Sequence, residues 1–185
     1  DRYKWIEYHK WKVSGELYTK VIGDFVIMSR AQFGYLGYYN RKWGYSPFEG
    51  FRVGGDGMSG YDTYGADIIA LRGYENYYLT PWEATPYNSN GYYAGNVYDK
   101  FTMEFRYPVI LQPQSTIFVL GFLEGGNCWS DIKKFNPFQI KRSAGVGVRV
   151  FLPMIGLLGI DWGYGFDNPV KKNRSQFHFL IGQQF

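Results

Sequence analysis

The side chains that could do chemistry in this chain are few and scattered. Cys128 is the only cysteine, so neither an internal disulfide nor a cysteine metal site can form. His9 and His178 lie at opposite ends of the sequence without an obvious catalytic partner, and we interpret them as histidines of a surface or an aqueous lumen. No Ser/His/Asp order, nucleophile elbow, phosphate-binding loop or two-carboxylate pocket stands out. We therefore expect a protein that is not an enzyme and uses no cofactor.

One short motif could make a specific contact: Leu71-Arg72-Gly73-Tyr74, which follows the glycine-rich segment Val53-Gly54-Gly55. A guanidinium group stays charged and offers five donors in a rigid fork, so it can clamp two carboxylates. Gly73 would allow a tight backbone turn, and Tyr74 could pack against a wall. An Arg-Gly-aromatic triplet is common by itself, however, and Arg72 could equally be a solvated loop charge.

In the segments that must position this motif, apolar residues alternate with polar residues or glycine with period two. No window shows the i, i+3, i+4 pattern of an amphipathic helix. One face of these segments is apolar, whereas the other carries glycine and charge. The pattern predicts seven strands, at about residues 3–20, 24–38, 97–107, 116–127, 143–152, 158–166 and 177–185.

Strand length indicates the environment. The predicted strands have 9 to 18 residues, whereas strands of soluble proteins average about five or six and a tilted membrane crossing takes about 9 to 11. Aromatic residues make up 21% of the chain and charged residues 19%, with 24 glycines and a mean hydropathy of −0.32. In the C-terminal half, the uncharged stretch Val150 to Ile160 is too short for a spanning helix. The sequence therefore predicts an all-β protein, an antiparallel transmembrane β-barrel.

Residues 39–95 are predicted to form one long loop that contains the Arg-Gly-Tyr motif. The segment is crowded with Gly, Asp, Asn, Ser and Pro. A loop of this length is usually functional or disordered, and its many aromatic rings argue against disorder. Seven strands is an odd number, whereas bacterial single-chain barrels have an even one. Either the loop contains one more strand, or residues 1–185 are the C-terminal portion of a larger barrel.

The strand pattern begins at Tyr3, which favours the larger barrel. No secretory signal is visible at Asp1 to Trp5, so we expect a mature or cut chain.

The chain finishes on an aromatic strand. Phe177, Phe179, Ile181 and Phe185 are expected to face lipid, because the last strand of a barrel closes the wall and places rings at the membrane interface. Gly182 interrupts this strand and would let it kink, since glycine tolerates the bend and weakens strand pairing.

The order of these motifs resembles the C-terminal half of the BamA-type outer-membrane assembly factors, a family that also holds two-partner secretion transporters and organelle import barrels. Besides the Arg-Gly-Tyr motif, the similar segments are Met103-Glu104-Phe105-Arg106-Tyr107-Pro108, Phe122-Leu123-Glu124-Gly125-Gly126, Arg142-Ser143-Ala144-Gly145-Val146-Gly147 and Gly159-Ile160-Asp161. The resemblance spans nearly all of the chain. The loop before the motif is longer than usual, and the family's periplasmic repeats and first barrel half are absent from this sequence.

The resemblance implies that the loop folds back into the barrel and that Arg72 pairs with Glu104 and Glu124 on the inner wall. Strand parity places Glu104 on the same face as Lys100 and Arg106, and phenylalanines share the face of Glu124. The alternative is that these acids pair locally with Lys100 or Arg106.

The resemblance also implies that Phe177, Phe179, Ile181, Gly182 and Phe185 form an insertion signal and one side of a seam. Client strands would enter through this seam by β-augmentation. The implied function is that of an insertase in the outer membrane of a Gram-negative-type bacterium. Its implied partners are outer-membrane lipid, nascent β-barrel clients, accessory assembly lipoproteins and the missing N-terminal half with its periplasmic domains.

Three other functions stay open from the sequence: a secretion or translocation pore of the same family, a small complete structural barrel, and a soluble carbohydrate-binding β-sandwich. Nucleic acid is not an expected partner. The net charge of +4 and pI near 9.0 come from basic residues spread singly along the strands rather than gathered in one stripe.

Overall fold

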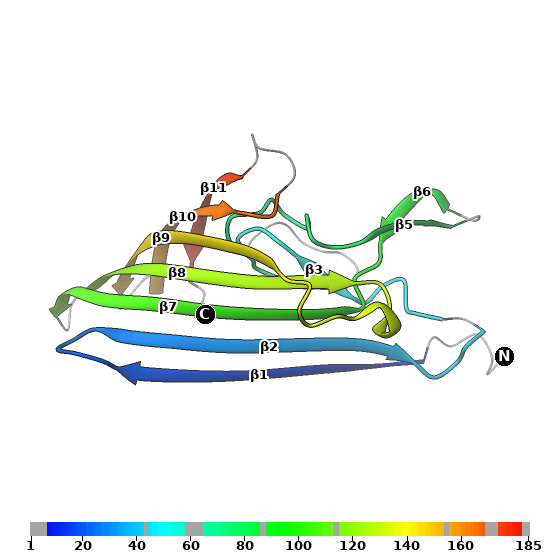
Figure 1. The fold of residues 1–185 in the computed structure, drawn as a ribbon, viewed down its shortest axis with the longest axis horizontal. Coiled ribbons are helices and arrows are strands. Elements are labelled where there is room, and N and C mark those ends of the chain that lie inside the picture. The colour runs from blue at the N-terminus through cyan, green and yellow to red at the C-terminus, as the bar shows by residue number, and fades with distance from the viewer. Residues whose placement is uncertain are drawn as a thin grey trace.

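The dominant element is one antiparallel sheet of seven strands, as Figure 1 shows for this computed structural model. The structure describes residues 7–42, 44–57, 65–85, 88–112, 115–153, 156–168 and 174–182. The strands, in their order across the sheet, are β1 (Tyr8–Lys20), β2 (Val26–Tyr38), β7 (Val97–Gln112), β8 (Ser115–Trp129), β9 (Lys141–Leu152), β10 (Gly156–Gly165) and β11 (Ser175–Ile181). The predicted all-β fold, a partial barrel of seven strands, is thereby confirmed.

The connections between the strands are unequal at the two ends of the sheet. Residues 21–25, 113–114 and 153–155 form the short ones, whereas residues 39–96, 130–140 and 166–174 form the long ones. Short turns at one rim and long loops at the other are typical of outer-membrane barrels. The 130–140 connection contains a short 3₁₀ helix, η2 (Ile132–Lys134), whose N-terminus is capped by the Asp131 side chain.

Strand β7 is longer than the alternation predicted, because it continues beyond Tyr107 to Gln112. Pro108 lies within it, and the pairing register with β8 shifts between Pro108 and Ile110. Proline lacks a backbone N–H and cannot complete a regular ladder, so a local irregularity accommodates it.

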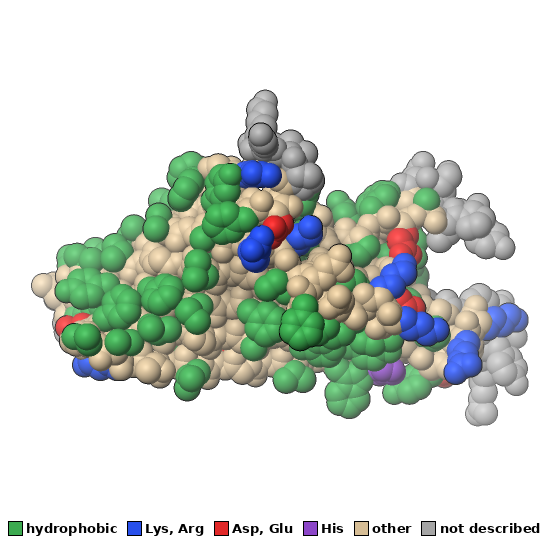
Figure 2. Space-filling model, viewed as in Figure 1, with side chains coloured by type: hydrophobic (Ala, Val, Ile, Leu, Met, Phe, Trp, Pro, Cys, Tyr) green, Lys and Arg blue, Asp and Glu red, His purple; other side chains and the backbone are tan. Residues whose placement is uncertain are grey.

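The two faces of the sheet have opposite chemistry. Apolar side chains of one face are exposed, among them Trp11, Phe101, Leu123, Val146, Ile160 and Phe177. Polar and charged side chains of the other face are buried, among them Lys100, Thr102, Glu104, Glu124, Arg149 and Asp161. Figure 2 shows the apolar side chains spread along the outer side of the strands. Apolar residues outside and polar residues inside are the arrangement of a wall that separates lipid from an aqueous lumen.

The long connection after β2 is more ordered than the sequence predicted. It contains a parallel pair, β3 (Phe51–Val53) with β4 (Asp67–Ile69), and an antiparallel pair, β5 (Trp82–Thr85) with β6 (Asn88–Tyr93). These strands have three to six residues, so they are too short to show a period-two pattern. Among the described residues, no helix is both long and apolar enough to cross a membrane.

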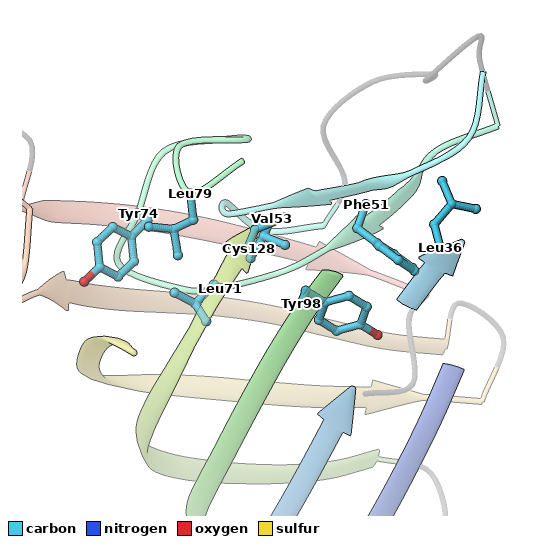
Figure 3. Close-up of a cluster of buried hydrophobic side chains, with 8 residues drawn as sticks. All are labelled: Leu36, Phe51, Val53, Leu71, Tyr74, Leu79, Tyr98 and Cys128. Atoms are coloured by element: carbon cyan, nitrogen blue, oxygen red, sulfur yellow. The ribbon is translucent and has the colours of Figure 1, made fainter. Parts of the chain in front are cut away.

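A buried apolar cluster attaches this long connection to the inner face of the sheet. Figure 3 shows its members, of which Leu36, Tyr98 and Cys128 come from β2, β7 and β8, whereas the connection contributes Phe51, Val53, Leu71, Tyr74 and Leu79. The rings of Phe51 and Tyr98 meet edge to face at 4.7 Å. The core of this chain therefore lies between the loop and the wall, and it places the segment around Arg72 against the strands.

Candidate functional site: a buried arginine between loop and wall

Local backbone geometry fixes how the Arg-Gly-Tyr motif approaches the wall. Leu71 forms a bridge with Gly55 and donates its N–H to that residue's carbonyl at 3.0 Å. Gly73 has a φ of 88°, a left-handed conformation that favours glycine. A Cβ atom at Gly73 would also lie 3.0 Å from the backbone nitrogen of Gly165 and from Cβ of Ser143. Both the backbone conformation and the tight space therefore favour glycine at this position.

Arg72 reaches carboxylates on three different strands. Its Nη2 lies 2.6 Å from Glu104 Oε1 on β7 and 2.8 Å from Glu124 Oε1 on β8, and its Nη1 lies 3.0 Å from Asp161 Oδ2 on β10. Its Nε also donates to Glu124 Oε1 at 3.1 Å, and its backbone N–H donates to Glu124 Oε2 at 2.8 Å. Only 4% of the residue is exposed. Every nitrogen of the guanidinium group is therefore hydrogen-bonded, which a buried charge requires.

An aromatic ring supports the guanidinium group from the wall side. The Cζ atom of Arg72 lies 3.7 Å from the centroid of the Phe122 ring, a cation–π contact. Phe122 and Glu124 share the inner face of β8 because they are two residues apart. Burial by itself would lower the pKa of Arg72, but the nearby carboxylates of Glu124, Glu104 and Asp161 outweigh burial and hold its pKa above the usual value.

Each carboxylate at the site also has a basic partner on the wall itself. These pairs are Lys100 Nζ with Glu124 Oε1 at 3.2 Å, Arg106 Nη2 with Glu104 Oε2 at 2.6 Å, and Arg149 Nη2 with Asp161 Oδ2 at 2.7 Å. The contact of the acids with the loop and their local pairing with Lys100 and Arg106, which the sequence posed as alternatives, occur together in the structure.

The two residues that follow Arg72 make neutral contacts with the wall. The Gly73 N–H donates to His178 Nε2 on β11 at 2.8 Å, so this nitrogen acts as an acceptor and carries no proton. The Tyr74 hydroxyl donates to the carbonyl oxygen of Arg142 at 2.8 Å. Burial raises the pKa of Tyr74 to about 12, so the hydroxyl keeps its proton at neutral pH.

The inner face of β10 has glycines, and so no side chains, at the positions where the backbone of the motif lies on it. A Cβ atom at Gly163 would lie 2.7 Å from the backbone nitrogen of Gly73, and one at Gly165 would lie 2.5 Å from the Gly73 carbonyl oxygen. Real Cβ atoms do not approach so closely, so the loop backbone can rest on β10 only because these positions are glycine.

The structure brings Arg72 to Glu104 and Glu124, and it adds three residues that the sequence reasoning did not assign to the site: Asp161, Arg149 and His178. Asp161 alternates with inward-facing glycines along β10, and His178 lies between two outward-facing phenylalanines of β11. Strand parity was the signal that could have placed Asp161 and His178 on the inner wall. The sequence suggested no partner for His178, whereas in the structure its imidazole accepts a hydrogen bond from the Gly73 N–H.

The residues of the expected insertion signal lie on the outer face of β11. Phe177, Phe179 and Ile181 are 67%, 58% and 59% exposed. Gly182 follows the end of β11 with a φ of 69°, and its N–H donates to the Leu157 carbonyl at 2.7 Å. Phe185 lies outside the described residues.

The chemistry that this site supplies is a charge-assisted attachment of a loop to a wall. Within the part of the chain that the structure describes, no group of three or more His, Cys, Asp or Glu side chains is placed to hold a metal ion. Comparison with known proteins gives a match between residues 2–185 and the Omp85 superfamily domain. No curated protein matches the chain.

Proposed function

Because the chain belongs to the Omp85 superfamily, we propose that it is the C-terminal part of the barrel of a BamA-type outer-membrane insertase. Domains of this superfamily are associated with the bacterial outer membrane and with the insertion or translocation of proteins there. In the narrower function proposed, nascent β-barrel proteins are assembled at an edge of the sheet, and the Arg72-Gly73-Tyr74 segment holds the loop inside the barrel.

The observation that carries this proposal is the apolar core between loop and wall. Phe51, Val53, Leu71 and Tyr74 of the loop are fully buried, so the loop is packed as an integral part of the structure. A loop packed in this way fills the lumen on the side of these strands. Insertion of client strands at an edge of the sheet therefore suits this geometry better than passage of a protein through the lumen.

The two outer edges of the sheet are where client strands would pair. Among the described residues, β1 and β11 are the two outer strands of the seven-stranded sheet and each pair with one neighbour, whereas the five strands between them in the sheet pair with two. Strand β11 has seven residues, compared with 16 in β7, so its pairing with β10 is short. An exposed edge is a template for an incoming strand, whose backbone groups would complete the ladder.

The proposed partners follow from the two faces and the edges. Lipid would contact the exposed apolar face, client strands would pair at the β11 edge, and the β1 edge would continue into an N-terminal half of the barrel with periplasmic domains and accessory lipoproteins. The open order of the sheet weighs against a small complete barrel, in which β1 and β11 would pair with each other.

The proposal is tested by depleting the full-length protein in its native cells and comparing two classes of protein. We expect loss of folded β-barrel proteins from the outer membrane, seen as loss of their protease-resistant form. If barrel proteins fold normally while an exported protein accumulates in the periplasm, the protein is a secretion pore and the proposal is wrong.

A further inference from the structure

The charges that meet at the arginine site do not sum to zero. Four cations meet three carboxylates among the described residues: Arg72, Lys100, Arg106 and Arg149 against Glu104, Glu124 and Asp161. The loop therefore contributes the surplus positive charge. Without Arg72, each carboxylate retains one basic partner from the wall, and the wall is neutral.

The pairing of each carboxylate with a base of the wall determines how stable the wall is after the loop leaves it. A buried carboxylate that loses its only partner is strongly destabilising, because its desolvation is no longer compensated. The three wall bases, as we call Lys100, Arg106 and Arg149, prevent this outcome. Two of them are buried beside the acids in the docked state, since Lys100 is 6% exposed and Arg149 is 2% exposed.

Two wall bases also contact the same oxygen atoms as Arg72. Glu124 Oε1 lies 2.8 Å from Arg72 Nη2 and 3.2 Å from Lys100 Nζ. Asp161 Oδ2 lies 3.0 Å from Arg72 Nη1 and 2.7 Å from Arg149 Nη2. A donor that shares an acceptor with a second cation is held less tightly than one that has the acceptor to itself, because the cations repel each other.

We propose that the wall bases make the attachment of the loop reversible. They compete with Arg72 in the docked state and replace it in a released state, in which residues 72–74 leave the wall and the carboxylates stay paired. The wall bases are thus residues that tune how tightly the loop is held. The proposal concerns the loop equilibrium and stands whether the protein inserts or exports its clients.

Hydrogen exchange of the motif's own amides reads this equilibrium directly. The Arg72 N–H is bonded to Glu124 and the Gly73 N–H to His178 in the docked loop, so both amides exchange when the segment leaves the wall. The measurement uses the full-length protein in lipid vesicles, with mass spectrometry of peptides that cover residues 72–74.

The variants are chosen so that the proposal predicts opposite signs. Lys100→Met removes a competitor and leaves Glu124 dependent on Arg72, so protection of these amides should rise on the order of tenfold. Glu124→Gln removes a carboxylate and should lower protection by a similar factor. Lys20→Met is the matched control, because Lys20 pairs with Asp24 in the β1–β2 turn and not with the site; protection should not change.

A fall in protection in Lys100→Met would show that the wall base supports the docked loop, and would overturn the proposal. Unchanged protection would overturn it as well. Arg106→Met provides a second test if Lys100→Met does not fold, because the Arg106 side chain is 23% exposed. Arg106 contacts Glu104 Oε2 whereas Arg72 contacts Oε1, so its removal leaves Glu104 dependent on Arg72, and protection should again rise. Lys100→Arg, which keeps the positive charge, should show the same amide protection as the wild type.

Discussion

The charge balance at the arginine site predicts an unexpected order of stability for two single substitutions. Arg72→Ala removes hydrogen bonds to three carboxylates, but every carboxylate keeps a wall base. We therefore expect a loss near that of a charged hydrogen bond, about 1.5–3 kcal/mol. Asp161→Asn keeps the shape of the side chain, yet it leaves both Arg72 and Arg149 without the carboxylate that they share. Breaking a buried pair from one side costs about 3–5 kcal/mol, so Asp161→Asn should be the more damaging change.

The assay is reversible unfolding of the full-length protein by guanidinium chloride in lipid vesicles, followed by tryptophan fluorescence. The free energies of unfolding of the two variants are compared with wild type in one lipid composition and at one pH. A loss for Arg72→Ala that equals or exceeds the loss for Asp161→Asn would refute the reasoning, because it would mean that the wall acids depend on the loop for their neutralisation.

Three further outcomes are expected. Gly73→Ala should release the loop and expose it to protease, whereas Gly44→Ala should not, because Gly44 also has a positive φ but has nothing within 4 Å of its added Cβ; equal protease sensitivity would argue against a tight approach at Gly73. The hydrogen bond from Arg142 lowers the pKa of Asp167 to about 2. The contribution of this pair should therefore be complete above about pH 4 and be lost as the pH falls through 2, and a carboxyl NMR titration of Asp167 near pH 4 would contradict this. Phe179→Lys places a charge on the outer face and should destabilise the protein in vesicles by about 2–4 kcal/mol if the residue lies near the bilayer centre; a change near zero would indicate that the face contacts water.

The period-two pattern was sufficient to predict the wall. Each long strand has one face that is apolar and one that is polar or glycine, and this alternation fixes which residues look outward whatever the strands pair with. The pattern failed in residues 39–96, where β3 and β4 have only three residues each. Those strands are held by their packing on the inner wall and not by their own sequence period.

The arginine site could be predicted only in part from the sequence. Arg72 lies 32, 52 and 89 residues away from its three acidic partners, so no local pattern connects them. The resemblance of the motifs indicated Glu104 and Glu124. Parity alone would also have allowed Asp161, but it could not show that β10 lies beside the loop, because that neighbourhood depends on the curvature of the whole sheet.

The most direct test of the central claim is a structure of the full-length protein determined in a lipid bilayer. We expect the Arg72 guanidinium group within hydrogen-bonding distance of Glu104, Glu124 and Asp161, with acyl-chain density along Phe177 and Phe179. An Arg72 side chain in solvent with the loop away from β10, or a β11 outer face that contacts water, would contradict the claim that a clamped loop lies inside a membrane-embedded wall.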